Sequence, residues 1–224
     1  MVINTDKKFI FIHIPKTAGT SITASLKSLK GNQKRWLANT KHETLTEFHD
    51  HLLERLSLFD KLFRKKPDQY FTFGFVRNPW DRLASLHRYL IEKRPRPEID
   101  TISTFKQFLI EANEGCDWIR SLRTMRPQVD FFTCPDGQLK IDFLGHYEHL
   151  GEDIKTLADE LNIPLKLTHK NGSTNQKNDY RFSYDDEMAE IVAKLFEEDC
   201  RHFGYQFDSV YPSSRCSGPV YCQR

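Results

Sequence analysis

Apolar residues along this chain occur either in short continuous runs or at every third or fourth position. Lys8–Ile14 and Tyr70–Val76 are continuous runs rich in aromatic and β-branched residues, and they predict two buried strands. Ala18–Leu29 carries apolar residues on one helical face, which predicts a helix soon after the first strand. Arg35–Asn39 predicts a further short strand.

Two longer segments show the helical period most clearly. In Thr44–Arg64 the apolar residues fall on one face, and Thr44 and Glu47 form the capping-box pattern that marks a helix start. Asn78–Lys93 opens with an Asn-Pro pair, which supplies an N-cap residue followed by proline at the first helical position. Both segments therefore predict helices with defined beginnings.

The second half of the chain is less regular. Ser103–Ala112, Glu152–Leu161 and Ser183–Cys200 have helical patterns, the last with Ser183 as its cap. Val129–Thr133 and Leu139–Leu144 flank a Pro-Asp-Gly turn signal, which predicts a hairpin or two short extended pieces.

The alternation of strands and helices predicts an α/β fold. We expect a mostly parallel sheet with helices on both faces, in a P-loop-like nucleotide-binding architecture. The length of 224 residues suits one domain, which we place at residues 1–207, with a loosely held tail at residues 208–224. Ligands of such sheets bind at the carboxyl ends of the strands.

Composition narrows the classes of function. The chain has 33 basic and 31 acidic residues, and a net charge of +2 gives no reason to expect a nucleic-acid partner. No stretch approaches the roughly 20 apolar residues of a membrane span, and no leader pattern opens the sequence, so we expect a cytoplasmic protein. The five cysteines lack metal-ligand spacing, and nothing in the sequence indicates an oligomeric state.

The first candidate site is Ile14–Ser21, which leaves the first predicted strand and opens a helix. Such a turn presents backbone N–H groups and a positive helix end to an anion, and its glycine allows close backbone approach. Considered alone, the segment has an alternative interpretation as a capped helix after a strand. It does not match a Walker A loop, because its only glycine follows the lysine. The residues expected to contact an anion are Lys16, Thr17, Ala18, Gly19, Thr20 and Ser21.

The second candidate site is Arg77–Ser85, which follows the second strong strand. The guanidinium of Arg77 can donate two parallel hydrogen bonds to a phosphate, and Ser85 lies about two turns into the next helix. If the two strands are parallel, Arg77 lies at the same sheet edge as Lys16. The alternative is a surface arginine beside a helix cap.

Together these segments resemble the sulfotransferases that use 3′-phosphoadenosine-5′-phosphosulfate (PAPS), in the branch with carbohydrate sulfotransferases and soluble bacterial relatives. Phe11–Ser21 is similar to that family's 5′-phosphosulfate loop, and Phe75–Ser85 is similar to its 3′-phosphate motif. Weaker similarity continues through Asp142–Glu148 and Asp199–Tyr205, so the resemblance spans about residues 8–207.

The resemblance implies a role for each matched residue. Lys16 would contact the sulfate and the bridging oxygen of the leaving phosphate, Thr17–Ser21 would hold the 5′-phosphate, and Arg77 and Ser85 would hold the 3′-phosphate. The products would be a sulfated acceptor and adenosine 3′,5′-bisphosphate, without a metal. The acceptor would be a hydroxyl, in preference to an amine, of a carbohydrate or small metabolite.

The acceptor hydroxyl needs a base to take its proton. Our candidate is His42, just before the capped helix, because a helix N-terminus disfavours the charged imidazolium and keeps the ring able to accept a proton. Relatives carry a histidine or a glutamate in this region, so Glu43 is the alternative, and a solvated loop histidine is the non-catalytic interpretation. We interpret His13, at the end of the first strand, as structural.

Two other functions share this architecture. An ATP-dependent small-molecule kinase would carry a full Walker A pattern and an acidic metal-holding residue after a strand, and neither is evident. A non-catalytic nucleotide-binding module would need neither Lys16 nor His42, both of which are present.

Overall fold

The computed structural model describes residues 1–30, 41–55, 70–93, 97–100, 102, 104–167 and 179–209. The strand expected at Arg35–Asn39 lies outside these residues, as does the end of the expected tail from residue 210. The chain folds into two compact units. Unit 1 comprises residues 1–76, 128–171 and 216–224, and unit 2 comprises residues 77–127 and 172–215.

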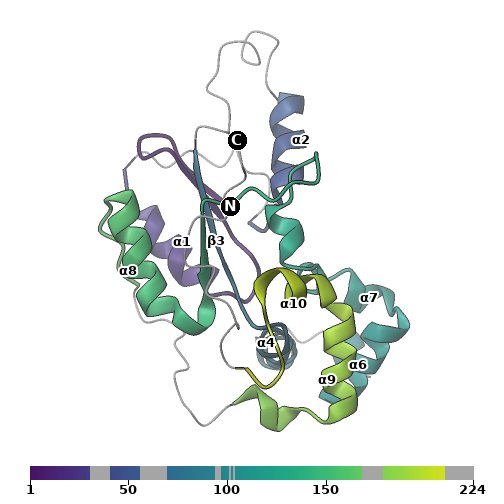
Figure 1. The fold of residues 1–224 in the computed structure, drawn as a ribbon. Coiled ribbons are helices and arrows are strands. Elements are labelled where there is room, and N and C mark those ends of the chain that lie inside the picture. The colour runs from purple at the N-terminus through teal and green to yellow at the C-terminus, as the bar shows by residue number, and fades with distance from the viewer. Residues whose placement is uncertain are drawn as a thin grey trace. The chain divides into compact units, whose positions relative to one another are not determined.

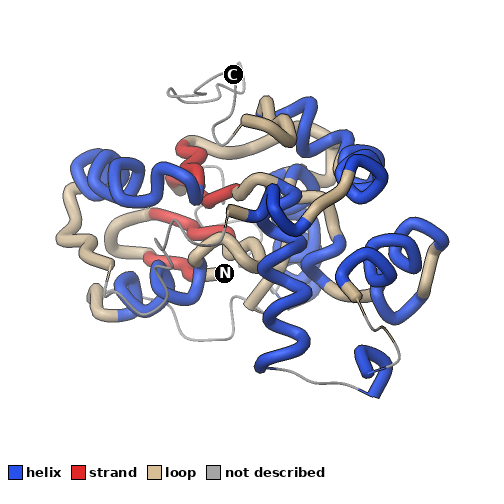
Figure 2. Tube along the Cα trace, turned by 90° about the horizontal axis from the view of Figure 1, so that it is seen from below, coloured by secondary structure: helices blue, strands red, loops and turns tan. Residues whose placement is uncertain are grey.

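Unit 1 contains a four-stranded, mostly parallel sheet (Figure 2). Its strands, in spatial order, are β1 (Val2–Asn4), β2 (Phe9–Ile12), β3 (Phe71–Val76) and β4 (Phe143–His146). β1 pairs antiparallel with β2, whereas β2 with β3 and β3 with β4 are parallel. The chain therefore leaves β2, β3 and β4 at the same sheet edge, and the predicted α/β class is confirmed.

One face of this sheet is aromatic. Phe9 and Phe11 of β2 and Phe73 and Phe75 of β3 alternate with residues of the opposite face and are buried. They form one core with helices α1 (Gly19–Lys27) and α8 (Leu150–Leu161), which lie on the same side of the sheet (Figure 1). The helices contribute the buried side chains Ile22, Leu26, Ile154 and Leu157.

On the other face of the sheet, a 3₁₀ turn packs against β3. Phe132, in the 3₁₀ helix η3 (Val129–Phe132), lies so close to Gly74 that a Cβ there would come within 2.6 Å of its ring. Helix α2 (Leu45–Arg55) contacts η3. The start of α2 carries the predicted capping box: Glu47 N–H donates to Thr44 Oγ1 at 3.1 Å, and Thr44 N–H donates to Glu47 Oε2 at 3.0 Å.

The described part of unit 2 is helical. Helix α4 (Pro79–Lys93) has the predicted bounds, starting at the Asn-Pro pair. The other elements are α5 (Pro97–Asp100), α6 (Phe105–Glu114), α7 (Asp117–Arg120), η2 (Arg123–Met125), η5 (Tyr180–Ser183), α9 (Asp186–Leu195) and α10 (Glu197–Phe203). Unit 1 also contains the 3₁₀ helix η4 (Tyr147–His149).

A buried arginine ties α4 to its neighbours in unit 2. Arg82 is 0% exposed, and its Nη atoms donate to the carbonyl of Arg126 at 3.3 and 3.2 Å. Its Nη1 lies 3.9 Å from Oδ2 of Asp199, which is also 0% exposed. Burial lowers the pKa of Arg82 to about 10, against the opposing effect of Asp199, so the guanidinium remains charged at neutral pH.

Two expectations for the second half of the chain are wrong in part. The segment expected to be extended from Val129 forms η3. The Pro-Asp-Gly turn does form: Thr133 and Leu139 make an antiparallel bridge, and Cys134 N–H donates to the carbonyl of Gln138 at 2.8 Å. The helix expected from Ser183 is divided into α9 and α10, and it is capped by Asp185, which accepts from Met188 N–H at 2.9 Å. Strand β1 was not predicted, because three residues are too few to show a period.

Within the described part of the chain, none of the helices is long and apolar enough to cross a membrane.

Candidate functional site

The loop after β2 has a strained backbone at two positions that are not glycine. Lys16 has φ 71° and Ala18 has φ 61°, both in the left-handed region. Thr17 between them is 1% exposed, and its hydroxyl donates to the carbonyl of Ile14 at 3.1 Å. The hydroxyl of Thr17 is therefore used inside the loop, where it stabilises a conformation that Lys16 and Ala18 would not adopt readily by themselves.

Helix α1 begins from this loop with an alanine as its N-cap. Ala18 has no side-chain acceptor for the first N–H groups of the helix, although its carbonyl accepts from Ser21 N–H at 3.0 Å. Thr20 is exposed in the first turn, and Lys41 Nζ donates to its Oγ1 at 3.1 Å. The segment around the helix start thus combines backbone N–H groups with the hydroxyls of Thr20 and Ser21 and with two lysines, Lys16 and Lys41. This combination suits an anion.

The predicted base lies against the end of β2. His42 is half-buried, and its Nδ1 is 2.8 Å from the carbonyl oxygen of His13. Because a carbonyl oxygen can only accept, this hydrogen bond places the proton on Nδ1 of His42. In the neutral ring, Nε2 then carries the lone pair and can accept a proton.

The alternative base is differently placed. Glu43 is 1% exposed, and its Oε1 lies 2.6 Å from Nδ1 of His51 on α2. The carboxylate is therefore buried in an ion pair or charge-assisted hydrogen bond, in contrast to the half-buried ring of His42.

The motif after β3 is built from side chains and lies in unit 2. Arg77, the residue that follows Val76, has a side chain that is 10% exposed, and its Nε donates to Oδ2 of Asp81 at 2.8 Å. This ion pair between residues four apart fixes the stem of the arginine against the first turn of α4. Ser85 is half-buried on the same helix.

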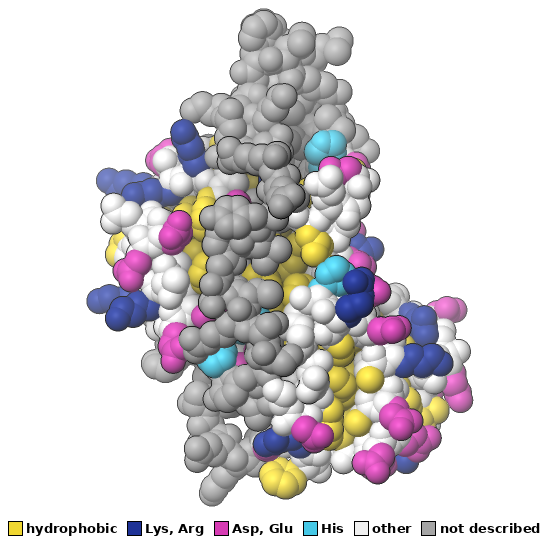
Figure 3. All heavy atoms as spheres, in the orientation of Figure 1, with side chains coloured by type: hydrophobic (Ala, Val, Ile, Leu, Met, Phe, Trp, Pro, Cys, Tyr) yellow, Lys and Arg dark blue, Asp and Glu magenta, His cyan; other side chains and the backbone are white. Residues whose placement is uncertain are grey.

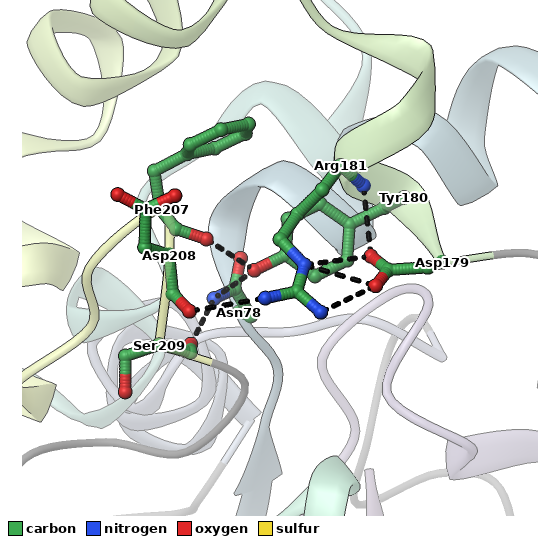
Figure 4. A network of polar contacts seen from close by, with 7 residues as sticks. All are labelled: Asn78, Asp179, Tyr180, Arg181, Phe207, Asp208 and Ser209. Carbon is green, nitrogen blue, oxygen red and sulfur yellow. Dashed lines mark hydrogen bonds and ion pairs between the residues drawn. The ribbon is translucent and has the colours of Figure 1, made fainter.

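Asn78 connects the start of α4 to the segment after α10 (Figure 4). Its Oδ1 caps α4 by accepting from Trp80 N–H at 3.0 Å, and its Nδ2 donates to Tyr180 Oη at 3.1 Å. The same Nδ2 lies 3.3 Å from the carbonyl of Gln206 and 3.4 Å from that of Ser209. Tyr180 Oη donates in turn to the carbonyl of Phe207 at 2.7 Å. Asn78, which is 1% exposed, therefore lies at the centre of a polar network that joins three segments of unit 2.

The structure brings part of the predicted site together within each unit. In unit 1, His42 donates to the carbonyl of His13, and the loop Lys16–Ser21 begins shortly after His13 along the chain. In unit 2, Arg77 lies just before α4 and Ser85 lies within it. The sequence did not identify Lys41 or His51 as participants. No local pattern signals either, because Lys41 meets Thr20 and His51 meets Glu43 only after folding.

Charge and metal-binding groups add little beyond these two motifs. On the face shown in Figure 3, the described basic and acidic side chains are interspersed. Among the residues that the structure describes, no three His, Cys, Asp or Glu side chains are grouped so that they could hold a metal ion.

Comparison with known proteins identifies relatives over most of the chain. The family model described as "Sulfotransferase family" matches residues 1–206. An uncharacterized protein of Archaeoglobus fulgidus is 33% identical over 110 residues, which cover 48% of this chain and 81% of the archaeal one. Carbohydrate sulfotransferase 14 of Danio rerio is 23% identical over 188 residues, covering 73% of this chain but only 48% of the fish protein. No solved structure matches.

Proposed function

This chain belongs to the sulfotransferase family, and on that basis we propose that it transfers a sulfuryl group from PAPS to a hydroxyl group of a carbohydrate or small metabolite. A carbohydrate acceptor is suggested by the name of the fish relative, about half of whose length this chain spans. We propose a hydroxyl in preference to an amine, because a hydroxyl oxygen becomes a good nucleophile only as a base takes its proton, whereas a neutral amine nitrogen is already nucleophilic.

The observation that carries the proposal is the hydrogen bond from His42 Nδ1 to the carbonyl of His13. It leaves Nε2 as the acceptor atom of a half-buried ring, the state that a general base requires. Glu43 is the weaker candidate, because it is buried and engaged by His51.

The loop after β2 fits the 5′-phosphosulfate end of PAPS. The first turn of α1 offers backbone N–H groups, and Thr20 and Ser21 add hydroxyls. Arg77 and Ser85 are assigned to the 3′-phosphate, for which a guanidinium is well suited. When bound, PAPS supplies the sulfuryl group and leaves as adenosine 3′,5′-bisphosphate.

The protein's own residues move the proton and balance the charge. His42 Nε2 takes the proton of the acceptor hydroxyl as its oxygen bonds to sulfur. Lys16 offsets the negative charge that develops on the phosphate oxygen when the bond between that oxygen and sulfur breaks, with the electron pair staying on oxygen. His42 then returns its proton to solvent, which restores the resting state.

Calorimetry followed by a product assay tests the proposal. Adenosine 3′,5′-bisphosphate should bind in excess chelator, whereas ATP with magnesium should not compete at similar concentration. Incubation with PAPS and a panel of desulfated polysaccharides and simple alcohols should then release the bisphosphate in step with acceptor sulfation. Binding of the bisphosphate only in the presence of magnesium, or phosphoryl transfer from ATP, would contradict the assignment.

A further inference from the structure

His13 is buried at a position that touches both parts of the candidate site in unit 1. It follows β2, is 2% exposed, and its Nδ1 is 3.2 Å from Oγ1 of Thr23 on α1. Burial, reinforced by the nearby His42 and Lys41, lowers the pKa of His13 to about 2. The ring is therefore neutral near neutral pH, and we assign it no part in proton transfer.

The imidazole of His13 packs directly against the helix start. A Cβ built on Gly19 would lie 2.1 Å from Cδ2 and 2.2 Å from Nε2 of His13. Gly19 is not among the glycines with positive φ, so its backbone conformation does not require glycine. The requirement comes from the ring of His13, which occupies the space that any side chain at position 19 would need.

The same residue supports the proposed base. The rings of His13 and His42 meet edge to face, with centroids 4.5 Å apart and an interplanar angle of 73°. The carbonyl of His13 accepts from His42 Nδ1. One residue thus contacts the loop proposed for the cofactor through its ring and the proposed base through both ring and carbonyl.

We propose that His13 is a positioning residue that sets the spacing between the start of α1 and the imidazole of His42. Its ring meets Gly19 and His42, and the hydroxyl of Thr23 holds that ring in orientation. The proposal rests on the proposed function for the roles of the loop and of His42, whereas the packing itself does not depend on it.

A double-variant cycle at positions 13 and 19 tests the packing. Gly19→Ala should weaken binding of adenosine 3′,5′-bisphosphate by about tenfold or more, because the methyl group displaces either the loop or the ring. In the His13→Asn background the ring is gone, and Gly19→Ala should then weaken binding by less than about threefold. Urea midpoints of all four proteins should show the same non-additivity, which makes the cycle readable without any enzymatic activity.

The single-turnover rate distinguishes a positioning role of His13 from a general effect of the residue on stability. His13→Asn keeps a polar group near Thr23, and it should lower the single-turnover rate about tenfold while leaving bisphosphate affinity within about threefold. Thr23→Val should cause a smaller loss of turnover with unchanged affinity, and Thr23→Ser should restore it. Ser25→Ala is the matched control, since Ser25 on the same helix donates to the carbonyl of Lys166 at 2.6 Å. It should retain wild-type turnover.

Three outcomes would overturn the proposal: equal losses from Gly19→Ala in both backgrounds, wild-type turnover in His13→Asn, or equal losses of turnover in Thr23→Val and Ser25→Ala. Failure of the proposed function has a different signature. In that case wild-type protein sulfates no acceptor, whereas the non-additivity in urea midpoint, which needs neither ligand nor turnover, still decides whether the ring of His13 controls the helix start.

Discussion

The segments after β2 and β3 each present a cation at the start of a helix, and they hold it by different means. After β2, Lys16 and Ala18 adopt left-handed backbone conformations, and a neutral, buried imidazole fills the space beside Gly19. After β3, polar side chains hold the backbone: Asp81 engages Arg77, and Asn78 joins the helix cap to Tyr180. The first geometry depends on close packing and backbone strain, whereas the second depends on hydrogen bonds.

This difference predicts different responses to substitution. A tightly packed loop has no room to adjust, so one added methyl group or one added charge is costly. A network of several hydrogen bonds loses them one at a time, and each loss is modest while the others remain. A single substitution should therefore cause a large loss of function or stability in the segment after β2, the first region. It should cause a smaller loss in the segment after β3, the second region.

The largest effect should come from the imidazole beside the first region. His42→Ala should lower single-turnover rates by roughly 10²–10⁴-fold, the usual contribution of a positioned general base. Affinity for adenosine 3′,5′-bisphosphate should be nearly unchanged, as measured by calorimetry. His49→Ala, at a histidine 46% exposed on α2, is the control and should behave as wild type.

Glu43→Gln distinguishes the two candidate bases. It should retain most of the turnover of the wild-type protein, because Glu43 is buried against His51. If Glu43→Gln abolishes turnover while His42→Ala does not, Glu43 is the base.

The second region should govern affinity more than turnover. Arg77→Ala should weaken bisphosphate binding by about 1.5–3 kcal/mol and Ser85→Ala by about 0.5–1.5 kcal/mol, the ranges for charge-assisted and neutral hydrogen bonds. Dissociation constants from calorimetry decide the order. Arg88→Ala removes an exposed arginine of the same helix and should change nothing. A larger loss for Ser85→Ala would show that the 3′-phosphate has been assigned to the wrong side chain.

Acid should lower the free energy of unfolding of the protein through His13, which lies in the first region. Its pKa is lowered by burial to about 2 in the folded protein, whereas an unfolded histidine titrates near 6.5. Below that pH the unfolded chain binds a proton that the folded chain does not. The contribution of the neutral His13 ring to the free energy of unfolding is therefore complete above pH 6.5. It is lost as the pH falls, by about 2 kcal/mol at pH 5.

Urea unfolding at pH 7 and pH 5 measures this loss. Burial also lowers the pKa of His87, which shifts stability in the same direction. Comparison with His13→Asn isolates the contribution of His13, since the variant cannot titrate there. Identical pH dependence in wild type and variant would mean that His13 is not buried as a neutral ring.

The smallest effect should come from one bond of the network in the second region. Tyr180→Phe removes the hydroxyl that contacts Asn78 and the carbonyl of Phe207, while the other contacts of Asn78 remain. It should lower the free energy of unfolding by about 0.5–1.5 kcal/mol and change bisphosphate affinity by less than about threefold. An abrupt loss of folding would show that the network is not graded and that the two regions behave alike.

Local signals explain which features the sequence could predict. The beginning of α4 follows from Asn78-Pro79, and the beginning of α2 follows from Thr44 and Glu47, because cap chemistry acts within four residues. The segment at Val129–Phe132 was predicted wrongly because its apolar residues serve the core as a 3₁₀ turn, in which Phe132 covers Gly74. Tertiary packing overrode strand propensity there.

The site was predictable in its motifs and not in its internal contacts. The loop and the arginine after the strands are visible in order along the chain, and their roles remain predictions. The contact between His13 and Gly19 depends on a turn with positive φ at Lys16 and Ala18, two residue types that rarely adopt it. Propensity therefore argues against the very turn that brings the ring to the helix.

The buried pair of Arg82 and Asp199 has a consequence for the history of the sequence. Replacing either residue alone leaves the other charge buried without its oppositely charged partner, which costs roughly 3–5 kcal/mol, a large share of a domain's stability. Replacing both with well-packed apolar residues costs far less. Descendants of a common ancestor should thus keep both residues or lose both, and positions 82 and 199 should covary although they lie far apart along the chain.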